Sequence, residues 1–216
     1  MCGILCVLGK RARLITGTLK HRGPDASRVV TVGNCAMEFS RLAINDTSED
    51  GMQPFVNPTA MLVCNGEIYN HKDLWQETEG GSDCACLLPL VETQGIMATS
   101  RMLRGVFAMC YTDGQKVLVS RDHLGIRPLF FTRFTDDDGK PGIAFASEVK
   151  ALLQFESQVH IFPPGHVFNS SIDTPGSDSG FTAWCVGRFV LFFSELTDAV
   201  TAGTRVTGNS PRRDHP

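Results

Sequence analysis

Short apolar runs of strand length recur along the chain and limit its fold more than any other feature. Valine, isoleucine, leucine and phenylalanine are frequent in these runs, and turn-forming residues separate them. The pairs Asp113-Gly114 and Asp138-Gly139 stand between successive runs, as in tight β-hairpins. Neighbouring runs are therefore predicted to pair antiparallel. We expect strands at residues 3–8, 27–33, 35–44, 60–65, 106–113, 115–122, 129–134 and 142–148.

Segments of helical character are few and lie between groups of strands. We expect them at 69–78, 85–94 and 146–155. Ser82 and Asp83 are the candidate N-caps of the second helix. Pro89 weakens that helix, because proline lacks the N–H that a helix interior uses. Strict β-α alternation is absent, so the sequence predicts an α+β fold with largely antiparallel sheets.

Charge and hydropathy exclude several classes of protein. The 216 residues carry a formal net charge of −3, without the basic stripe of a nucleic-acid binder. The apolar stretch VGRFVLFFSEL is shorter than the roughly 18–20 residues that span a bilayer. The start, MCGILCVLG, lacks the basic region of a secretory signal. We therefore expect a cytoplasmic protein that binds neither nucleic acid nor membrane.

Eight cysteines are spread over the chain, and most lie inside apolar runs. Reduced thiols in such runs are normally buried. The pair Cys84 and Cys86 lacks the spacing of a zinc knuckle, and no second pair completes four ligands. The pattern predicts buried free thiols and no metal site.

Cys2 directly follows the initiator methionine. Removal of Met1 would place a thiol and a free α-amine on one residue. An α-amine has a pKa near 7.7–8.0, so it can serve as general base for the thiol beside it. On position alone, the simpler interpretation is an ordinary small residue at a start site.

Other residues supply what acyl chemistry and an amino-acid substrate need. Asn65 offers a side-chain NH₂ and Gly66 an unobstructed backbone N–H for a developing oxyanion. Arg41 is suited to a carboxylate and Asp83 to an ammonium group. Each has an alternative: an Asn-Gly hairpin turn for the first pair, a solvated surface charge for Arg41 and a helix cap for Asp83.

Several motifs occur together in one order, and jointly they are specific. They are MCGI, HRGPD (21–25), SRLAIND (40–46), GMQP (51–54), CNGEIYNH (64–71), GSD (81–83), LRGVFA (103–108), RDHLGIRPLF (121–130), ASEVKAL (146–152) and PPGH (163–166). With these motifs the chain resembles the N-terminal glutaminase domain of glutamine-hydrolysing asparagine synthetases, which is a class II glutamine amidotransferase of the N-terminal nucleophile hydrolase type. The resemblance extends from Met1 to about Phe168.

The resemblance implies a four-layer αββα sandwich of two antiparallel sheets. It also implies that Cys2 attacks the side-chain amide of glutamine and that Asn65 and Gly66 form the oxyanion hole. Arg41 would bind the α-carboxylate of glutamine and Asp83 its α-ammonium group. The rest of the glutamine pocket would consist of the backbone of Leu42, Ala43, Ile44 and Asn45, together with Glu67.

The charged residues Arg22, Asp25 and Arg121-Asp122-His123 are instead expected to have a structural role. Such residues, flanked by Gly-Pro or Leu-Gly, tie loops together through ion pairs and backbone contacts. We therefore expect Asp122 and His123 to take no part in the chemistry.

The chain departs from the family after the glutaminase motifs. We predict an amidotransferase domain at 1–168, followed at 169–216 by a linker and a remnant leading toward an absent synthetase domain. No Ser-Gly-Gly-x-Asp-Ser phosphate loop occurs, so ATP and Mg would belong to that missing synthetase domain, on a separate domain or chain. We expect no cofactor here.

Two changes near the predicted pocket keep other interpretations open. The 72–80 segment is shorter than in the family, and Ala85 and Pro89 interrupt the helix after Asp83, which could displace that carboxylate. A non-catalytic module that binds glutamine or docks on a synthetase is one alternative. A truncated, inactive synthetase fragment is another.

Overall fold

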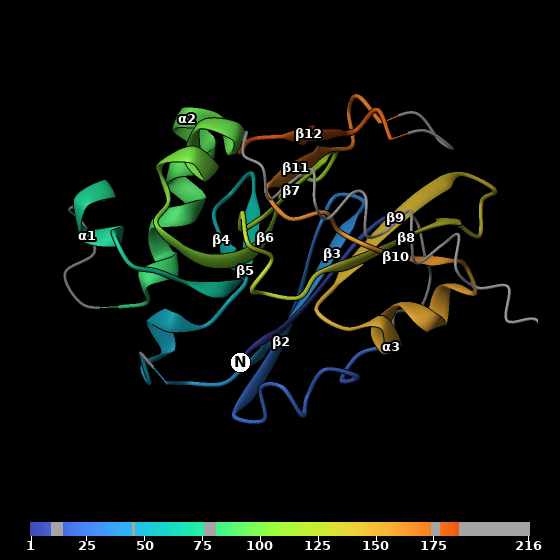
Figure 1. The fold of residues 1–216 in the computed structure, drawn as a ribbon. Coiled ribbons are helices and arrows are strands. Elements are labelled where there is room, and N and C mark those ends of the chain that lie inside the picture. The colour runs from blue at the N-terminus through green and yellow to red at the C-terminus, as the bar shows by residue number, and fades with distance from the viewer. Residues whose placement is uncertain (10–14, 45, 76–80, 174–177, 186–216) are drawn as a thin grey trace, which may run out of the picture.

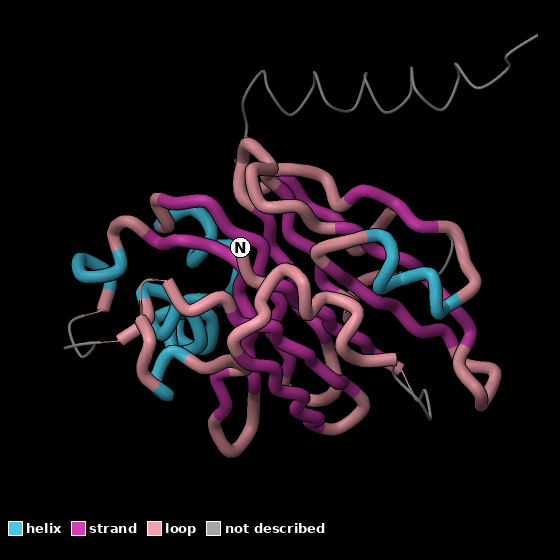
Figure 2. The backbone as a smooth tube through the Cα atoms, turned by 90° about the horizontal axis from the view of Figure 1, so that it is seen from below, coloured by secondary structure: helices cyan, strands magenta, loops and turns pink. Residues whose placement is uncertain are grey.

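The computed structural model describes residues 1–9, 15–44, 46–75, 81–173 and 178–185. Within these ranges the chain forms two six-stranded sheets, and every pair of neighbouring strands is antiparallel. The sheets pack face to face, with the helices outside them (Figures 1 and 2).

The first sheet contains the amino-terminal strand at an inner position. Its order is β10-β8-β9-β1-β3-β2. The central strand β1 pairs with β3 on one side and β9 on the other, so the segment just after Cys2 is held on both edges. The strands are β1 (Gly3–Leu8), β2 (Ala26–Val32), β3 (Cys35–Arg41), β8 (Phe130–Thr135), β9 (Pro141–Ala146) and β10 (Val159–Ile161).

The second sheet has the order β12-β11-β7-β6-β5-β4. Its longest pairing joins β5 and β6 over the full length of both strands. The short strand β4 covers only the start of the outer edge of β5. The strands are β4 (Phe55–Val56), β5 (Met61–Ile68), β6 (Gly105–Thr112), β7 (Val117–Arg121), β11 (His166–Asn169) and β12 (Phe181–Ala183).

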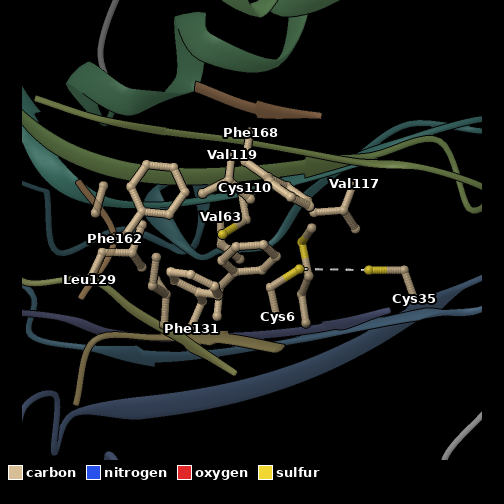
Figure 3. Close-up of a cluster of buried hydrophobic side chains, with 14 of the residues drawn as sticks. Cys6, Cys35, Val63, Cys110, Val117, Val119, Leu129, Phe131, Phe162 and Phe168 are labelled. Atoms are coloured by element: carbon tan, nitrogen blue, oxygen red, sulfur yellow. Dashed lines mark hydrogen bonds between the residues drawn. The ribbon is translucent and has the colours of Figure 1, made fainter. Parts of the chain in front are cut away.

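The main core lies between the sheets, where alternate residues of each strand face inward. In β1 these are Ile4 and Cys6, and in β6 Ala108 and Cys110. Cys6 and Cys35 lie side by side in this core, with 3.7 Å between their sulfur atoms (Figure 3). All eight cysteines are free thiols and six of them are buried, which confirms the expectation of buried thiols.

The outer faces of the sheets are covered by helices. Leu5 and Val7 of β1 pack against α3 (Val149–Leu152) and the 3₁₀ turn η3 (Leu153–Phe155). Leu62 of β5 and Met109 of β6 pack against α2 (Leu87–Met102). Figure 1 shows α2 and α3 on opposite sides of the paired sheets. This confirms the predicted four-layer αββα arrangement.

The structure confirms the three predicted helices only in part. The first is only one turn, α1 (His71–Leu74), and residues 76–80 of the shortened segment lie outside the described residues. The second begins with the 3₁₀ turn η2 (Asp83–Cys86) and continues into α2. Pro89 lies in the first turn of α2, where the missing N–H has no intrahelical acceptor to lose. The expectation that Pro89 interrupts the helix was therefore wrong.

The helical break occurs at a glycine instead. Gly95 has φ of 78° and ψ of 155°, which divides α2 directly after the predicted end at residue 94. The third predicted helix is shorter than expected, because residues up to Ala146 belong to β9. A further 3₁₀ turn, η1, spans Glu49–Gly51.

Two strand boundaries correct the prediction. β3 ends at Arg41 rather than at residue 44. β5 continues to Ile68, so Asn65 and Gly66 lie within a strand and not in a hairpin turn. The Asp-Gly hairpins are confirmed, since Gly114 and Gly139 have positive φ of 86° and 75° in the β6–β7 and β8–β9 turns.

The second sheet extends beyond residue 168. β12 pairs with β11, and the Trp184 ring stacks on that of Phe107 with 6.1 Å between centroids. β12 and Trp184 lie in the region 169–216 that was predicted as linker and remnant. Residues 174–177 and 186–216 of that region lie outside the described residues. Within the described part of the chain, no helix is both long and apolar enough to cross a membrane.

Candidate active site

A cavity of about 110 Å³ lies beside the amino terminus, at the end of β3 and the outer edge of β5. It gathers residues from five separate stretches of sequence, which only the fold brings together. The lining residues are Met1, Cys2, Phe39, Arg41, Leu42, Ile44, Asp46, Gly51, Gln53, Cys64, Asn65, Gly66, Glu67, Ser82, Asp83, Cys84 and Arg127.

Cys2 is half-buried and directly precedes β1. Its sulfur accepts a hydrogen bond from the Leu42 N–H at 3.4 Å and lies 3.7 Å from the Leu42 carbonyl oxygen. Burial raises the pKa of the Cys2 thiol, and this outweighs the lowering by the Leu42 contact, the terminal amine and Arg41. The thiol is thus ordered but mainly protonated at neutral pH, so a nucleophilic role requires a base.

Asn65 brings an unused donor to the same cavity. Asn65 is only 2% exposed, and its Nδ2 atom has no hydrogen-bond partner. A buried amide nitrogen without a partner is unfavourable, and native proteins seldom keep one without a reason. An acceptor atom that enters the cavity would satisfy this group.

The Gly66 N–H faces the outer edge of β5. In an antiparallel strand, successive N–H groups point to opposite edges. The N–H groups of Cys64 and Ile68 point outward, since they donate to the side chains of Gln53 and Asp83 at 2.6 and 2.5 Å. The N–H of Gly66 lies between them and therefore points the same way, into the cavity that Gly66 lines.

Gly66 also has a steric reason to lack a side chain. A Cβ at this position would lie 2.6 Å from the Val106 carbonyl oxygen and 2.9 Å from Phe107. Close pairing with β6 thus excludes every other residue at this position. In the sequence, the signal for this close approach is the glycine at the end of an apolar run.

Arg41 is held with its guanidinium at the cavity. It is 6% exposed, and it donates to the carbonyl oxygens of Ser48 and Asp46 at 2.7 and 2.5 Å. A Cβ on Gly51 would lie 2.6 Å from its Nη2 atom, so the guanidinium fills the space beside this glycine. The charge is buried rather than solvated, which rules out the alternative of an exposed surface residue.

Asp83 accepts a hydrogen bond from the Ile68 N–H and lines the cavity. Ser82, not Asp83, is the N-cap of η2, because its Oγ accepts from the Cys84 N–H at 3.3 Å. The carboxylate of Asp83 instead fixes the start of η2 against the outer edge of β5. It therefore lies on the same side of β5 as the Gly66 N–H.

The remaining predicted pocket residues differ in their placement. Leu42 and Ile44 line the cavity, whereas the Ala43 N–H donates to the Asp25 carboxylate at 2.8 Å. Asn45 lies outside the described residues. Glu67 lines the cavity and forms an ion pair of 3.0 Å with Arg127.

Gln53 and Arg127 are among the cavity residues that the sequence prediction missed. Gln53 is 4% exposed and anchors the edge of β5 through the Cys64 N–H. Arg127 fixes Glu67. Both lie in quoted motifs, GMQP and RDHLGIRPLF, but neither motif indicates which side chain reaches a site.

The RDHLGIRPLF loop is held by backbone contacts. Arg121 donates to the carbonyl oxygens of Gly125, Arg127 and Phe162. The buried carboxylate of Asp122 accepts from four backbone N–H groups, those of Phe107, Leu124, Ile126 and Arg127. These bonds satisfy both charges without any ligand, in agreement with the expected structural role.

Among the residues that the structure describes, no group of three or more His, Cys, Asp and Glu side chains could hold a metal ion. The cavity offers a thiol, amide and backbone donors, a guanidinium and carboxylates. This set suits an uncharged amide carbonyl on a zwitterionic ligand.

Comparison with known proteins identifies the class. The family model described as the glutamine amidotransferase domain matches residues 1–171, and the chain belongs to this family. Two solved structures share the fold. The allosteric regulatory enzyme of purine biosynthesis aligns at a TM-score of 0.69 and 19% identity, over 86% of this chain and 50% of that one. Glutamine phosphoribosylpyrophosphate amidotransferase from B. subtilis aligns at 0.67 and 21%, with the same coverage.

The curated relatives indicate the branch of the family. An asparagine synthetase [glutamine-hydrolyzing] 3 of Arabidopsis thaliana is 39% identical over 188 residues, covering 79% of this chain and 32% of the relative. A probable asparagine synthetase of Acanthamoeba polyphaga mimivirus is 39% identical, covering 74% and 32%. The root enzyme of Pisum sativum is 35% identical, covering 85% and 33%. The chain thus spans about a third of the length of these relatives.

Proposed function

We propose that this chain hydrolyses the side-chain amide of glutamine to glutamate and ammonia, with Cys2 as the nucleophile after removal of Met1. One observation carries the proposal above the others. The Cys2 thiol opens onto the same cavity as the partnerless Asn65 amide nitrogen. Acyl transfer needs a nucleophile and a donor for the oxyanion in one cavity, and the α-amine of Cys2 would supply the base.

In the first half-reaction, the α-amine of Cys2 accepts the thiol proton and the sulfur attacks the amide carbon. The carbonyl oxygen becomes an oxyanion, to which Asn65 and the Gly66 N–H donate. The C–N bond then breaks, the nitrogen takes the proton held by the α-amine, and ammonia leaves. A γ-glutamyl thioester remains on Cys2.

In the second half-reaction, water replaces ammonia. The neutral α-amine accepts a proton from the water as the water oxygen attacks the thioester carbon. The same two donors stabilise the second oxyanion, the C–S bond breaks, and the thiolate recovers the proton. Glutamate is released with the enzyme unchanged.

Recognition of the amino-acid end would fall to opposite charges in the cavity. Arg41 would bind the α-carboxylate, because its guanidinium is already oriented by Ser48 and Asp46. Asp83 would bind the α-ammonium group, and Glu67, held by Arg127, would support it. Leu42, Ile44 and Asn45 would complete the pocket.

The named relatives favour asparagine synthesis as the destination of the ammonia. In this proposal a separate synthetase domain or chain supplies the acceptor site. The sequence contains no Ser-Gly-Gly-x-Asp-Ser loop, so ATP and Mg would bind on that partner and not here.

Mass spectrometry of the amino terminus and a glutaminase assay test the proposal. We expect Met1 to be absent, ammonia release from glutamine, and loss of at least a thousandfold in rate for Cys2→Ala. Cys185→Ala is the matched control, because this half-buried thiol does not line the cavity. Retention of Met1, or activity unchanged in Cys2→Ala, would contradict the proposal. Calorimetric binding of glutamine without turnover would favour a non-catalytic binding module.

A further inference from the structure

Two consecutive residues after β9 hold the amino-terminal segment. Ser147 and Ile4 form a reciprocal pair: the Ser147 N–H donates to the Ile4 carbonyl, and the Ile4 N–H donates to the Ser147 Oγ, both at 3.0 Å. Ser147 is fully buried. The strand that carries Cys2 is thus fixed by the same residue through two bonds.

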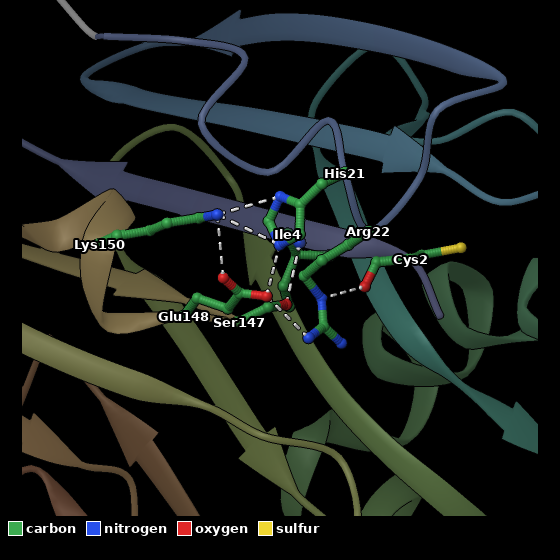
Figure 4. Close-up of polar contacts among 7 residues, drawn as sticks. All are labelled: Cys2, Ile4, His21, Arg22, Ser147, Glu148 and Lys150. Atoms are coloured by element: carbon green, nitrogen blue, oxygen red, sulfur yellow. Dashed lines mark hydrogen bonds and ion pairs between the residues drawn. The ribbon is translucent and has the colours of Figure 1, made fainter.

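The next residue, Glu148, is linked to Cys2 by hydrogen bonds through Arg22. Glu148 accepts from the Nη1 of Arg22 at 3.1 Å, and the Nε of Arg22 donates to the Cys2 carbonyl oxygen at 3.0 Å. Figure 4 shows the Cys2 carbonyl turned toward Arg22 and the sulfur turned the other way. The Arg22 side chain is only 11% exposed, so its charge is poorly screened by water.

Two more basic groups share the Glu148 carboxylate at the surface. His21 Nε2 lies 2.9 Å from the same oxygen that Arg22 contacts, and Lys150 Nζ lies 3.4 Å from the other oxygen. Figure 4 shows the three bases converging on this one carboxylate. Its negative charge balances the buried Arg22, and its hydrogen bond limits the rotation of the guanidinium.

We infer that Glu148 is a positioning residue for the proposed reaction, acting through Arg22 on the backbone of Cys2. The inference rests on the proposed function. Cys2 lies before the first residue of β1, just beyond the pairing of β1 with β3 that begins at Gly3. The Arg22 contact anchors the carbonyl end of Cys2, and the Leu42 contact holds its sulfur. Glu148 keeps the first of these anchors in place.

The charge balance makes the role of Glu148 testable. Replacing its carboxylate by an amide leaves Arg22 with an uncompensated charge close to Cys2. A nearby cation favours thiolate over thiol and neutral amine over ammonium, so both groups of Cys2 would titrate at lower pH. A residue that is only structural would not produce this shift. The other ionisable groups that line the cavity with Cys2 are Arg41, Asp46, Cys64, Glu67, Asp83, Cys84 and Arg127, and they are unchanged in the variant.

The experiment compares Glu148→Gln with wild type and with Asp113→Asn. Asp113 is a matched control, since its side chain is 32% exposed against 27% for Glu148 and it pairs with a single lysine in a distant turn. Steady-state glutaminase kinetics give kcat and KM. The rate of Cys2 alkylation by iodoacetamide, followed from pH 6 to 10 by mass spectrometry of the amino-terminal peptide, gives the titration midpoint.

We expect Glu148→Gln to lower kcat about tenfold with KM changed by less than about twofold. Its alkylation midpoint should move about half a unit to lower pH. Glu148→Asp, which keeps the charge, should restore the wild-type midpoint, and Asp113→Asn should change neither quantity. A wild-type midpoint in Glu148→Gln, or the same shift in Asp113→Asn, would overturn the inference.

Lys150→Met provides an independent variant should Glu148→Gln not fold. It removes a cation from the same carboxylate, so the midpoint should move to higher pH, and an unchanged midpoint would count against the inference. The alkylation readout also separates the two proposals. A wild-type protein without glutaminase activity would disprove the proposed function, whereas the direction of the shift would still decide the role of Glu148.

Discussion

The Leu42 N–H donates to the Cys2 sulfur across 3.4 Å, which joins the start of β1 to the first residue after β3. The two strands pair in antiparallel register, with Gly3 opposite Ser40. This register therefore places the Cys2 thiol beside the loop that begins directly after Arg41. A shift by one residue would turn the sulfur to the other face.

Asn65→Ala should lower kcat for glutamine hydrolysis about a hundredfold with little change in KM. The reason is that the Asn65 Nδ2 has no partner in the folded protein and would gain one only as the oxyanion forms. Steady-state kinetics at saturating and limiting glutamine separate the two constants. An increase in KM at constant kcat would assign Asn65 to ground-state binding instead.

Gly51→Ala should raise KM for glutamine about tenfold and affect kcat less. Its new methyl group would fall 2.6 Å from both the Arg41 Nη2 and the Asp46 Oδ2, so the guanidinium must move. Gly139→Ala is the control, since its Cβ meets nothing within 4 Å. That variant has a strained positive φ of 75°, so it should lose stability but keep the wild-type KM.

Asp122→Asn should lower the free energy of unfolding by about 2–4 kcal/mol. Its carboxylate accepts four backbone N–H groups, and an amide cannot accept as many bonds without presenting its own NH₂ to a donor. Urea unfolding gives this value. The specific activity of the folded variant should stay close to that of wild type, and its complete loss in a folded protein would contradict a structural role.

The stability that Glu148 contributes should depend on acidity. Partial burial acts to raise the pKa of Glu148, but hydrogen bonds from His21 and Arg22 outweigh it and hold the pKa below the usual 4.5. A carboxyl group whose pKa is lower in the folded state stabilises the protein at pH values above its pKa in the unfolded chain. This contribution disappears as the pH falls through the pKa of the folded state. At pH 7 the free energy of unfolding of the wild type should exceed that of Glu148→Gln by about 1 kcal/mol.

Thermal unfolding of the two proteins between pH 7 and pH 3 measures this difference. The gap in unfolding free energy should begin to narrow near pH 4.5 and close below it. A gap that stays constant to pH 3 would mean that Glu148 does not exchange its proton with these partners.

Local sequence signals predicted the strands and turns well, because each depends on nearest neighbours. The apolar runs became β1, β3 and β6 through β9 within a few residues, and both Asp-Gly pairs became hairpin turns. The errors arose where tertiary contacts overrule local preference. Asn65-Gly66 is a common turn pair, but β6 pairs alongside it and keeps the chain extended to Ile68.

Several site residues were predicted by type and not by geometry. Arg41 and Asp83 line the cavity with Cys2, as the motifs implied, and their substrate contacts stay predictions. The sequence did not indicate that Ser48 orients Arg41, or that Asp83 holds the edge of β5. Such contacts depend on loop paths, for which the sequence has no periodic signal.

The sequence by itself determined where most strands lie along the chain, their largely antiparallel pairing and the presence of a thiol next to the initiator methionine, because periodicity, turn residues and residue identity are local properties. The tertiary structure alone decided which edge the Gly66 N–H faces, which amide nitrogen lacks a partner, and that Glu148 reaches Cys2 through Arg22. The Glu148–Arg22 contact joins residues 126 positions apart, and differences of a few tenths of an ångström decide whether such a bond forms.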